Sequence, residues 1–178
     1  MNIPTSKTIG ITGAGGSLGK ALTKEFSSHG YKVIGFTHNR NLKELVEEGP
    51  NEWVYWECGK EFLLENSLSE IDILILNHGI YDSQSDLEKS IEINATSKIK
   101  ILRLFEKISL SQSIKSSPKE IWINTSEAEI LPALNPCYEI SKSLIGQIVT
   151  FKKNFNNQEK SRNLIIKKII LGPFKSDL

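Results

Sequence analysis

Short apolar runs alternate with amphipathic stretches along the whole chain. The apolar runs are rich in β-branched and aromatic residues, which favours strands buried on both faces of a sheet. Between these runs, apolar residues recur at helical spacing. This alternation predicts a parallel sheet with crossover helices. The six expected strands are Thr8–Thr12, Val33–Thr37, Trp53–Trp56, Ile71–Asn77, Ile121–Asn124 and Leu164–Leu171.

Three apolar stripes at helical spacing are expected to pack into the core of this sheet. No repeat, low-complexity tract or break in composition divides the chain, so residues 1–178 are expected to form a single domain. The stripes are Leu18, Ala21, Leu22 and Phe26; Ala95, Ile99, Leu102 and Phe105; and Leu144, Ile145, Ile148, Phe151 and Phe155.

Composition narrows the class of protein. A formal net charge of +1 gives no basic excess for binding nucleic acid, and the longest apolar stretches fall short of the ~20 residues of a membrane span. Cys58 and Cys137 are too few for a disulfide framework, and no signal segment opens the chain, so the cytoplasm is the expected compartment. The three histidines lack metal-ligand spacing, and no metal is expected.

A glycine-rich turn, Thr12–Gly19, follows the first predicted strand and opens a helix. Glycines allow a tight turn and a close approach to a pyrophosphate, while a helix N-terminus offers free N–H groups and a positive dipole end. We therefore expect the turn to bind a dinucleotide. A turn without a ligand is the alternative interpretation.

Tyr138 and Lys142 stand one helical turn apart and therefore share a helix face. A lysine ammonium beside a tyrosine lowers the pKa of the phenol, which can then exchange a proton near neutral pH. Ser126 lies twelve positions before Tyr138, at the end of a predicted strand, where ligands of parallel sheets bind. Each residue alone, like Asn94, could be purely structural; their conjunction favours a catalytic site.

The order of these motifs resembles the short-chain dehydrogenase/reductase family. Thr12–Gly19 resembles its TGxxxGxG fingerprint, with Ser17 in place of the middle glycine, and Asn77-His78-Gly79 resembles its NAG segment, with His78 in place of alanine. Residues 171–176 resemble its PGxVxT segment. The residues that resemble the family's catalytic tetrad are Asn94, Ser126, Tyr138 and Lys142.

The resemblance implies a Rossmann-like, doubly wound α/β sheet of about six strands and a hydride-transfer mechanism. In reduction, Tyr138 would protonate the carbonyl oxygen and Ser126 would hydrogen-bond the same oxygen. Lys142 would hold the nicotinamide ribose and favour the tyrosinate, while Asn94 would fix a water that passes protons to the lysine. The implied cofactor-binding residues are Gly13, Gly15, Gly16, Ser17, Leu18, Gly19, Thr37, His38, Arg40, Glu57, Asn77, His78, Gly79, Tyr138, Lys142, Gly172, Pro173, Phe174 and Ser176.

The second strand ends at Thr37, where NAD-specific relatives usually carry an acidic residue. Without a carboxylate there, Arg40 or protonated His38 could bind a 2′-phosphate, which favours NADP(H), with NAD(H) as the alternative. Glu57 could reach the adenine amino group or could be a surface carboxylate. Glu129, close after Ser126, could repel anionic substrates or face water, as could Glu127.

These features together predict an NADP(H)-dependent carbonyl reductase or alcohol dehydrogenase that acts on a small carbonyl or alcohol. An NADP(H)-binding redox-responsive regulator, or a complex subunit with little catalysis, is the alternative, and a fragment of a longer enzyme is a third. Related enzymes continue past the position of Leu178 into a substrate-covering loop, a helix and a last strand. We therefore expect the sixth strand at a sheet edge, weak substrate selectivity, and a homodimer formed through the helices that carry Ile99, Leu102, Phe105, Leu144, Ile148 and Phe151.

Overall fold

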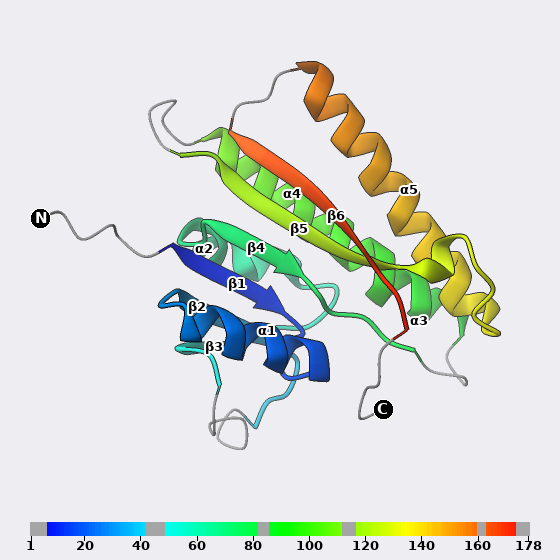
Figure 1. Cartoon of the computed structure of the whole chain (residues 1–178), viewed down its shortest axis with the longest axis horizontal. Coiled ribbons are helices and arrows are strands. Elements are labelled where there is room, and N and C mark those ends of the chain that lie inside the picture. The colour runs from blue at the N-terminus through cyan, green and yellow to red at the C-terminus, as the bar shows by residue number, and fades with distance from the viewer. Residues whose placement is uncertain (1–6, 42–48, 82–85, 112–116, 160–162, 174–178) are drawn as a thin grey trace, which may run out of the picture.

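The computed structural model describes residues 7–41, 49–81, 86–111, 117–159 and 163–173. Their strands form one parallel sheet in the order β3-β2-β1-β4-β5-β6 (Figure 1). All six predicted strands are confirmed, the first and the last with the expected bounds. β6 is an edge strand of this sheet, as expected. The strands are β1 Thr8–Thr12, β2 Lys32–Thr37, β3 Glu52–Tyr55, β4 Ile73–Leu76, β5 Lys119–Ser126 and β6 Leu164–Leu171.

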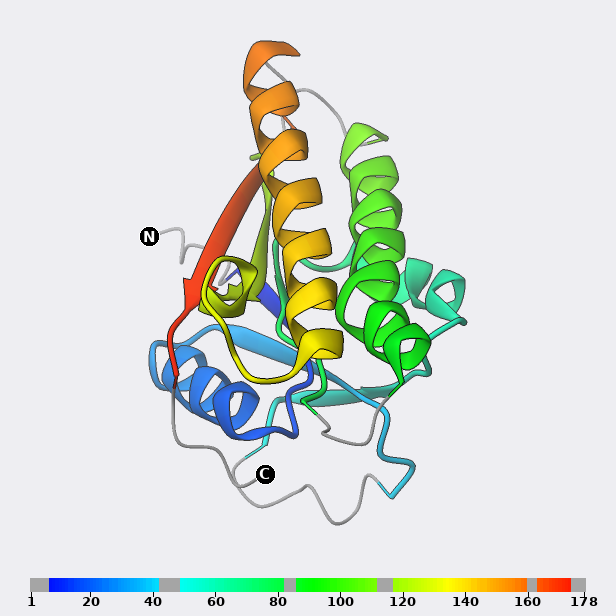
Figure 2. The same ribbon diagram turned by 90° about the vertical axis from the view of Figure 1, so that its right-hand side faces the viewer.

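Helices cover both faces of the sheet, which confirms the doubly wound α/β architecture. Figure 2 shows α4 and α5 side by side on one face and α1 on the other. Lys152 of α5 donates to Glu106 of α4 at 2.9 Å and bridges the two helices. The helical elements are α1 Ser17–Ser28, η2 Glu61–Leu64, α2 Glu65–Ser69, α3 Leu87–Ile91, the π-helical turn η3 Glu92–Thr96, α4 Ser97–Leu110, η4 Glu127–Glu129 and α5 Pro136–Glu159.

Each face of the sheet has its own apolar core. Under α4 and α5, Leu102 and Phe105 pack with Ile145 in the larger cluster, which also contains residues of the strands, η2 and α2. Under α1, Leu22 and Phe26 pack against the smaller cluster of strand residues. The two cores hold the sheet between helices and leave its carboxyl edge to carry polar side chains.

The prediction that the whole third stripe is core is wrong for Leu144, Phe151 and Phe155, which are 37%, 69% and 55% exposed. α5 packs on the sheet through Ile145 and Val149, which lie on a different face of the helix. Ala21 of the first stripe is exposed as well. The long helix α5 has two apolar faces, and spacing alone does not tell which one meets the sheet.

The sequence predicts neither a membrane span nor a metal site. No helix in the described part of the chain is both long enough and apolar enough to cross a bilayer. Within the same described ranges, no three His, Cys, Asp or Glu side chains gather as metal ligands.

Candidate active site

The carboxyl ends of β1, β4 and β5 meet where the strand order reverses. Thr12, the last residue of β1, ties this junction together. Its Oγ1 accepts hydrogen bonds from the backbone N–H of Asn77 at 2.9 Å and of His78 at 3.3 Å. The start of the glycine-rich turn is thereby fixed against the segment that follows β4.

Three glycines of the turn have three different reasons to lack a side chain. Gly13 has a φ of +67°, in the left-handed region, and a Cβ on Gly19 would lie 2.1 Å from the Gly13 carbonyl oxygen. A Cβ on Gly16 would meet only that oxygen, at 3.5 Å, so the N-terminus of α1 has open space beside it. A tight turn, a close helix contact and an open helix N-terminus are the features that a pyrophosphate requires. The turn therefore fits a dinucleotide; Gly15, Ser17 and Leu18 complete it.

The segment Asn77-His78-Gly79 lies beside this turn, as expected for the cofactor-facing strand end. The His78 ring is buried, with Nδ1 2.8 Å from Thr12 Oγ1 and its ring edge-on to Trp56 at 5.0 Å. Burial, and then the charges of neighbouring cations, lower the pKa of His78 well below its usual value, which keeps the ring neutral. His78 thus fills space behind the loop, while Gly79 faces the catalytic residues.

Asn94 lies in the π-helical turn η3 and is fully buried. Its Oδ1 accepts from the Ile80 N–H at 2.8 Å, and its Nδ2 donates to the Ile80 carbonyl and to Ser141 Oγ, both at 3.0 Å. Both amide hydrogens are used, so the predicted contact with a water would have to involve the second lone pair of Oδ1. The Asn94 side chain holds the segment after Gly79 against α5.

Lys142 and Tyr138 lie together at the start of α5, as predicted. Asn135 Oδ1 caps the helix by accepting from the Tyr138 N–H at 3.0 Å, and Pro136 occupies the first helical position. Lys142 Nζ lies 5.2 Å from the centroid of the Tyr138 ring, and Lys142 is 7% exposed. Burial lowers the pKa of Lys142 to about 8, while the Glu129 carboxylate opposes this shift. The lysine can therefore change its charge close to neutral pH.

Ser126 is the last residue of β5, at the carboxyl edge of the sheet as predicted. Its Oγ accepts from the Ala128 N–H at 3.2 Å and caps the short helix η4. The Glu129 side chain does not face water: it is 9% exposed and pairs with Lys168 of β6 at 2.5 Å. Glu127 is exposed.

The carboxyl ends of β2 and β3 hold the groups expected to choose the cofactor. Arg40 Nη2 donates to Glu57 Oε1 at 2.6 Å, Arg40 Nε donates to Tyr55 Oη at 2.8 Å, and Tyr55 Oη also donates to Glu57. The end of β2 itself carries no carboxylate, but Glu57 from beyond the end of β3 pairs with the arginine. Thr37 is buried and its Oγ1 accepts from the Asn39 N–H at 3.1 Å. His38 is exposed beside it.

The last predicted cofactor segment is only partly described. Gly172 and Pro173 follow β6 and are exposed. The expected contacts of Phe174 and Ser176 lie outside the described residues.

Two side chains at this site were not predicted. Lys98 is 1% exposed and its Nζ donates to the Asn124 carbonyl at 2.8 Å, while burial followed by the charge of Lys142 lowers the pKa of Lys98 well below its usual value. The ring of Tyr81 lies edge-on to Tyr138 at 5.0 Å. Lys98 stands four residues after Asn94, on the same helix face, which is the one sequence signal that could have revealed it.

The chain is similar in sequence to a known protein family and to a curated protein. A model of the NAD-dependent epimerase/dehydratase family matches residues 9–156. A curated protein of Synechocystis sp., monoglucosyldiacylglycerol epimerase, is 37% identical over 180 residues, which cover 97% of this chain. The chain spans 42% of the length of that relative.

Solved structures with low sequence identity share the fold. A short-chain dehydrogenase from Burkholderia cenocepacia in complex with NADP has a TM-score of 0.79 at 16% identity, covering 97% of this chain and 74% of its own. A short-chain dehydrogenase/reductase family oxidoreductase from Burkholderia thailandensis has a TM-score of 0.80 at 20% identity, covering 97% and 70%. These likenesses show a Rossmann-like fold of the type found in short-chain dehydrogenases.

Proposed function

The chain belongs to the NAD-dependent epimerase/dehydratase family, and from this premise we propose that it inverts one hydroxyl-bearing carbon in the sugar of a glycolipid. The reacting group is then an alcohol that becomes a ketone and is reduced again. The reaction is still the interconversion of an alcohol and a carbonyl that the sequence predicts, but the proposed substrate is a glycolipid instead of a small molecule. The 37% identity to a glycolipid epimerase supports this substrate class.

The observation that carries the proposed chemistry is the burial of Lys142 against Tyr138. Lys142 Nζ lies 5.2 Å from the centroid of the tyrosine ring, and burial lowers the pKa of this lysine to about 8. Tyr138 can exchange a proton with a substrate hydroxyl, and the ammonium of Lys142 beside its ring supports that exchange electrostatically. Ser126 ends β5 at the carboxyl edge of the sheet, where its hydroxyl can donate to the substrate oxygen.

In the proposed reaction, Tyr138 removes the hydroxyl proton as the carbon loses a hydride, and a ketone forms. A nicotinamide held beside Tyr138 and Lys142 would supply the hydride acceptor and donor for both halves of the reaction. Tyr138 gives the proton back to the oxygen when the hydride returns to the opposite face of the carbon. Atoms and electrons balance within one cycle, so no cofactor is consumed.

The cofactor preference is part of this proposal. The open N-terminus of α1 beside Gly16 supports a dinucleotide, and Arg40 at the end of β2 supports NADP(H) over NAD(H). A 2′-phosphate would have to displace Glu57 from Arg40, so the preference depends on that exchange.

The test is incubation with monoglucosyldiacylglycerol that carries deuterium on the ring carbons, with a catalytic amount of NADP⁺. We expect a hexosyl epimer that keeps its deuterium, without accumulation of NADPH, and a greatly reduced rate of epimer formation with Tyr138→Phe. Stoichiometric NADPH formation with a stable ketone would instead identify a dehydrogenase. Absence of any turnover with either cofactor and this lipid would refute the proposal.

A further inference from the structure

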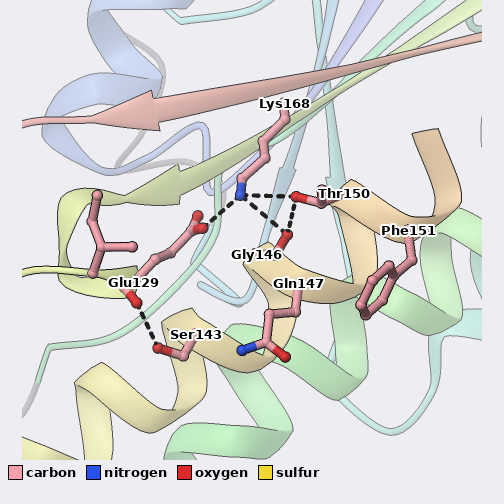
Figure 3. Close-up of a pocket in the computed structure, with 8 residues that line it drawn as sticks. Glu129, Ser143, Gly146, Gln147, Thr150, Phe151 and Lys168 are labelled. Carbon is pink, nitrogen blue, oxygen red and sulfur yellow. Dashed lines mark hydrogen bonds and ion pairs between the residues drawn. The ribbon is translucent and has the colours of Figure 1, made fainter. Parts of the chain in front are cut away.

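A buried ion pair lies beside the candidate site, between η4, α5 and β6. Lys168 Nζ of β6 donates to Glu129 Oε2 at 2.5 Å, to the Gly146 carbonyl at 3.1 Å and to Thr150 Oγ1 at 3.2 Å (Figure 3). The Lys168 and Glu129 side chains are 16% and 9% exposed. One lysine therefore ties the turn after Ser126 to the edge strand and to α5.

Two further contacts hold η4 against α5. Ser143 Oγ of α5 donates to the Glu129 carbonyl at 2.9 Å (Figure 3). A Cβ on Gly146 would lie 2.1 Å from both the carboxyl carbon and Oε2 of Glu129. A glycine in the interior of a helix is destabilising relative to alanine. Here it gives the carboxylate room to lie directly against α5.

This arrangement has an electrostatic cost that stability alone does not explain. Glu129 Oε1 is buried without a hydrogen-bond partner in the described part of the chain. Desolvating a carboxylate and leaving one oxygen unpaired is unfavourable, and an apolar pair of similar volume is often at least as stable. The carboxylate lies against Gly146, one helical turn after Lys142 on α5, which suggests a role at the site.

We propose that Glu129 is a positioning residue of the active site: its carboxylate, anchored by Lys168, fixes the turn that carries Ser126 against α5 and sets a negative charge one helical turn from Lys142. The proposal rests on the function proposed above for Tyr138 and Lys142. It extends that function by giving the catalytic lysine an acidic partner that touches neither substrate nor cofactor.

Four neighbours set the electrostatics around Lys142, and they come from different elements. Tyr138 of α5 presents its ring, while Lys98 of α4 and His78 after β4 interact with Lys142 as fellow bases. Glu129 of η4 is the group whose charge raises the pKa of Lys142 against the effect of burial. Removing this charge should therefore lower that pKa below its value of about 8.

The experiment measures the titration of Lys142 directly by NMR on lysine-labelled protein, with the resonance assigned by its loss in Lys142→Arg. In Glu129→Gln we expect the midpoint to fall by at least about half a pH unit. In Lys168→Met, the carboxylate loses its own cation, so the midpoint should rise. Gly146→Ala keeps both charges but displaces the carboxylate, and should give a smaller fall than Glu129→Gln.

Lys167→Met is the matched control. Lys167 is the preceding residue of β6, and its side chain pairs with Glu120 at 2.6 Å on the opposite face of the sheet. Removing it deletes an ion pair of the same strand and should leave the Lys142 midpoint unchanged. Circular dichroism and thermal unfolding check that each variant is folded.

Opposite shifts in Glu129→Gln and Lys168→Met support the proposal, because a merely structural pair would not move the titration in two directions. An unchanged midpoint in both variants, or the same shift in Lys167→Met, would overturn it. If Glu129→Gln does not fold, the direction of the shift in Lys168→Met decides. The titration needs no substrate, so lack of turnover on a glycolipid would count against the proposed function alone.

Discussion

Lys142 and Tyr138 form a stacked pair on α5, with the ammonium nitrogen 5.2 Å from the ring centroid of the tyrosine. Mutating each residue in turn can therefore distinguish the role of the tyrosine from that of the lysine. Tyr138→Phe keeps the ring and its contact with the lysine but removes the proton carrier. Turnover should fall by the roughly 10²–10⁴-fold typical of acid–base groups, with little change in cofactor affinity.

Lys142→Ala should reduce both turnover and cofactor affinity, because the lysine is expected to contact the nicotinamide ribose as well. Steady-state kinetics and calorimetric titration with NADPH measure the two effects. Near-native turnover in Tyr138→Phe would show that the tyrosine is structural.

The ion pair between Arg40 and Glu57 gives a prediction about cofactor choice. Glu57→Gln should free the guanidinium for a 2′-phosphate and increase the affinity for NADPH, while the affinity for NADH changes little. Arg40→Ala should weaken NADPH binding alone. Calorimetric titrations at one salt concentration measure both. Tighter binding of NADH than of NADPH by the unmodified chain would contradict the assignment of NADP(H).

The sequence predicted the strands well because each contains a short apolar run, and an unbroken apolar run without alternation favours a strand covered on both faces of a sheet. It also placed Tyr138 beside Lys142, through helix spacing, and Ser126 at the end of a strand. It did not reveal the pairing of Glu129 with Lys168, thirty-nine positions apart, because that contact depends on how η4, α5 and β6 meet.

The pairing of Arg40 with Glu57 escaped prediction for the same reason. Their side chains come from the ends of two neighbouring strands, and each residue alone looks like a solvated surface charge. Tertiary packing, rather than local pattern, decides which charges of this chain are buried or paired.

The buried amine of Lys98 gives a prediction about stability and pH. Burial lowers the pKa of Lys98 well below 10.5, so the unfolded chain binds this proton over a pH range in which the native chain does not. Stability should therefore rise with pH within that range, by up to about 1.4 kcal/mol per pH unit for one group. Lys142, with a pKa of about 8, adds a rise of the same sign above that pH.

Lys98→Met should reduce the rise in unfolding free energy between pH 8 and pH 9.5, measured by urea denaturation. Lys107→Met is the matched control on α4, because Lys107 is 73% exposed and its removal should leave the slope unchanged. An unchanged slope in Lys98→Met would mean that Lys98 remains charged in the native chain.

The apolar side chains on the outer face of α5 give the last prediction, a homodimer. Ile140, Leu144, Phe151 and Phe155 are 48%, 37%, 69% and 55% exposed, and they recur on one face of a 24-residue helix. Leu102 and Phe105 of α4, expected at the same interface, are buried in the core, so α5 would supply most of the contact. Pairing at the edge strand β6 is the competing arrangement.

Size-exclusion chromatography with light scattering should show a dimer at tens of micromolar. Phe151→Glu should convert it to a monomer, because a carboxylate in a two-fold apolar contact is desolvated and faces its own copy. Ile165→Glu on β6 should leave the dimer intact, since Ile165 is 42% exposed but lies on the edge strand rather than on α5. The reverse pattern would assign the interface to the strand edge, and a monomeric native chain would contradict dimer formation through either surface.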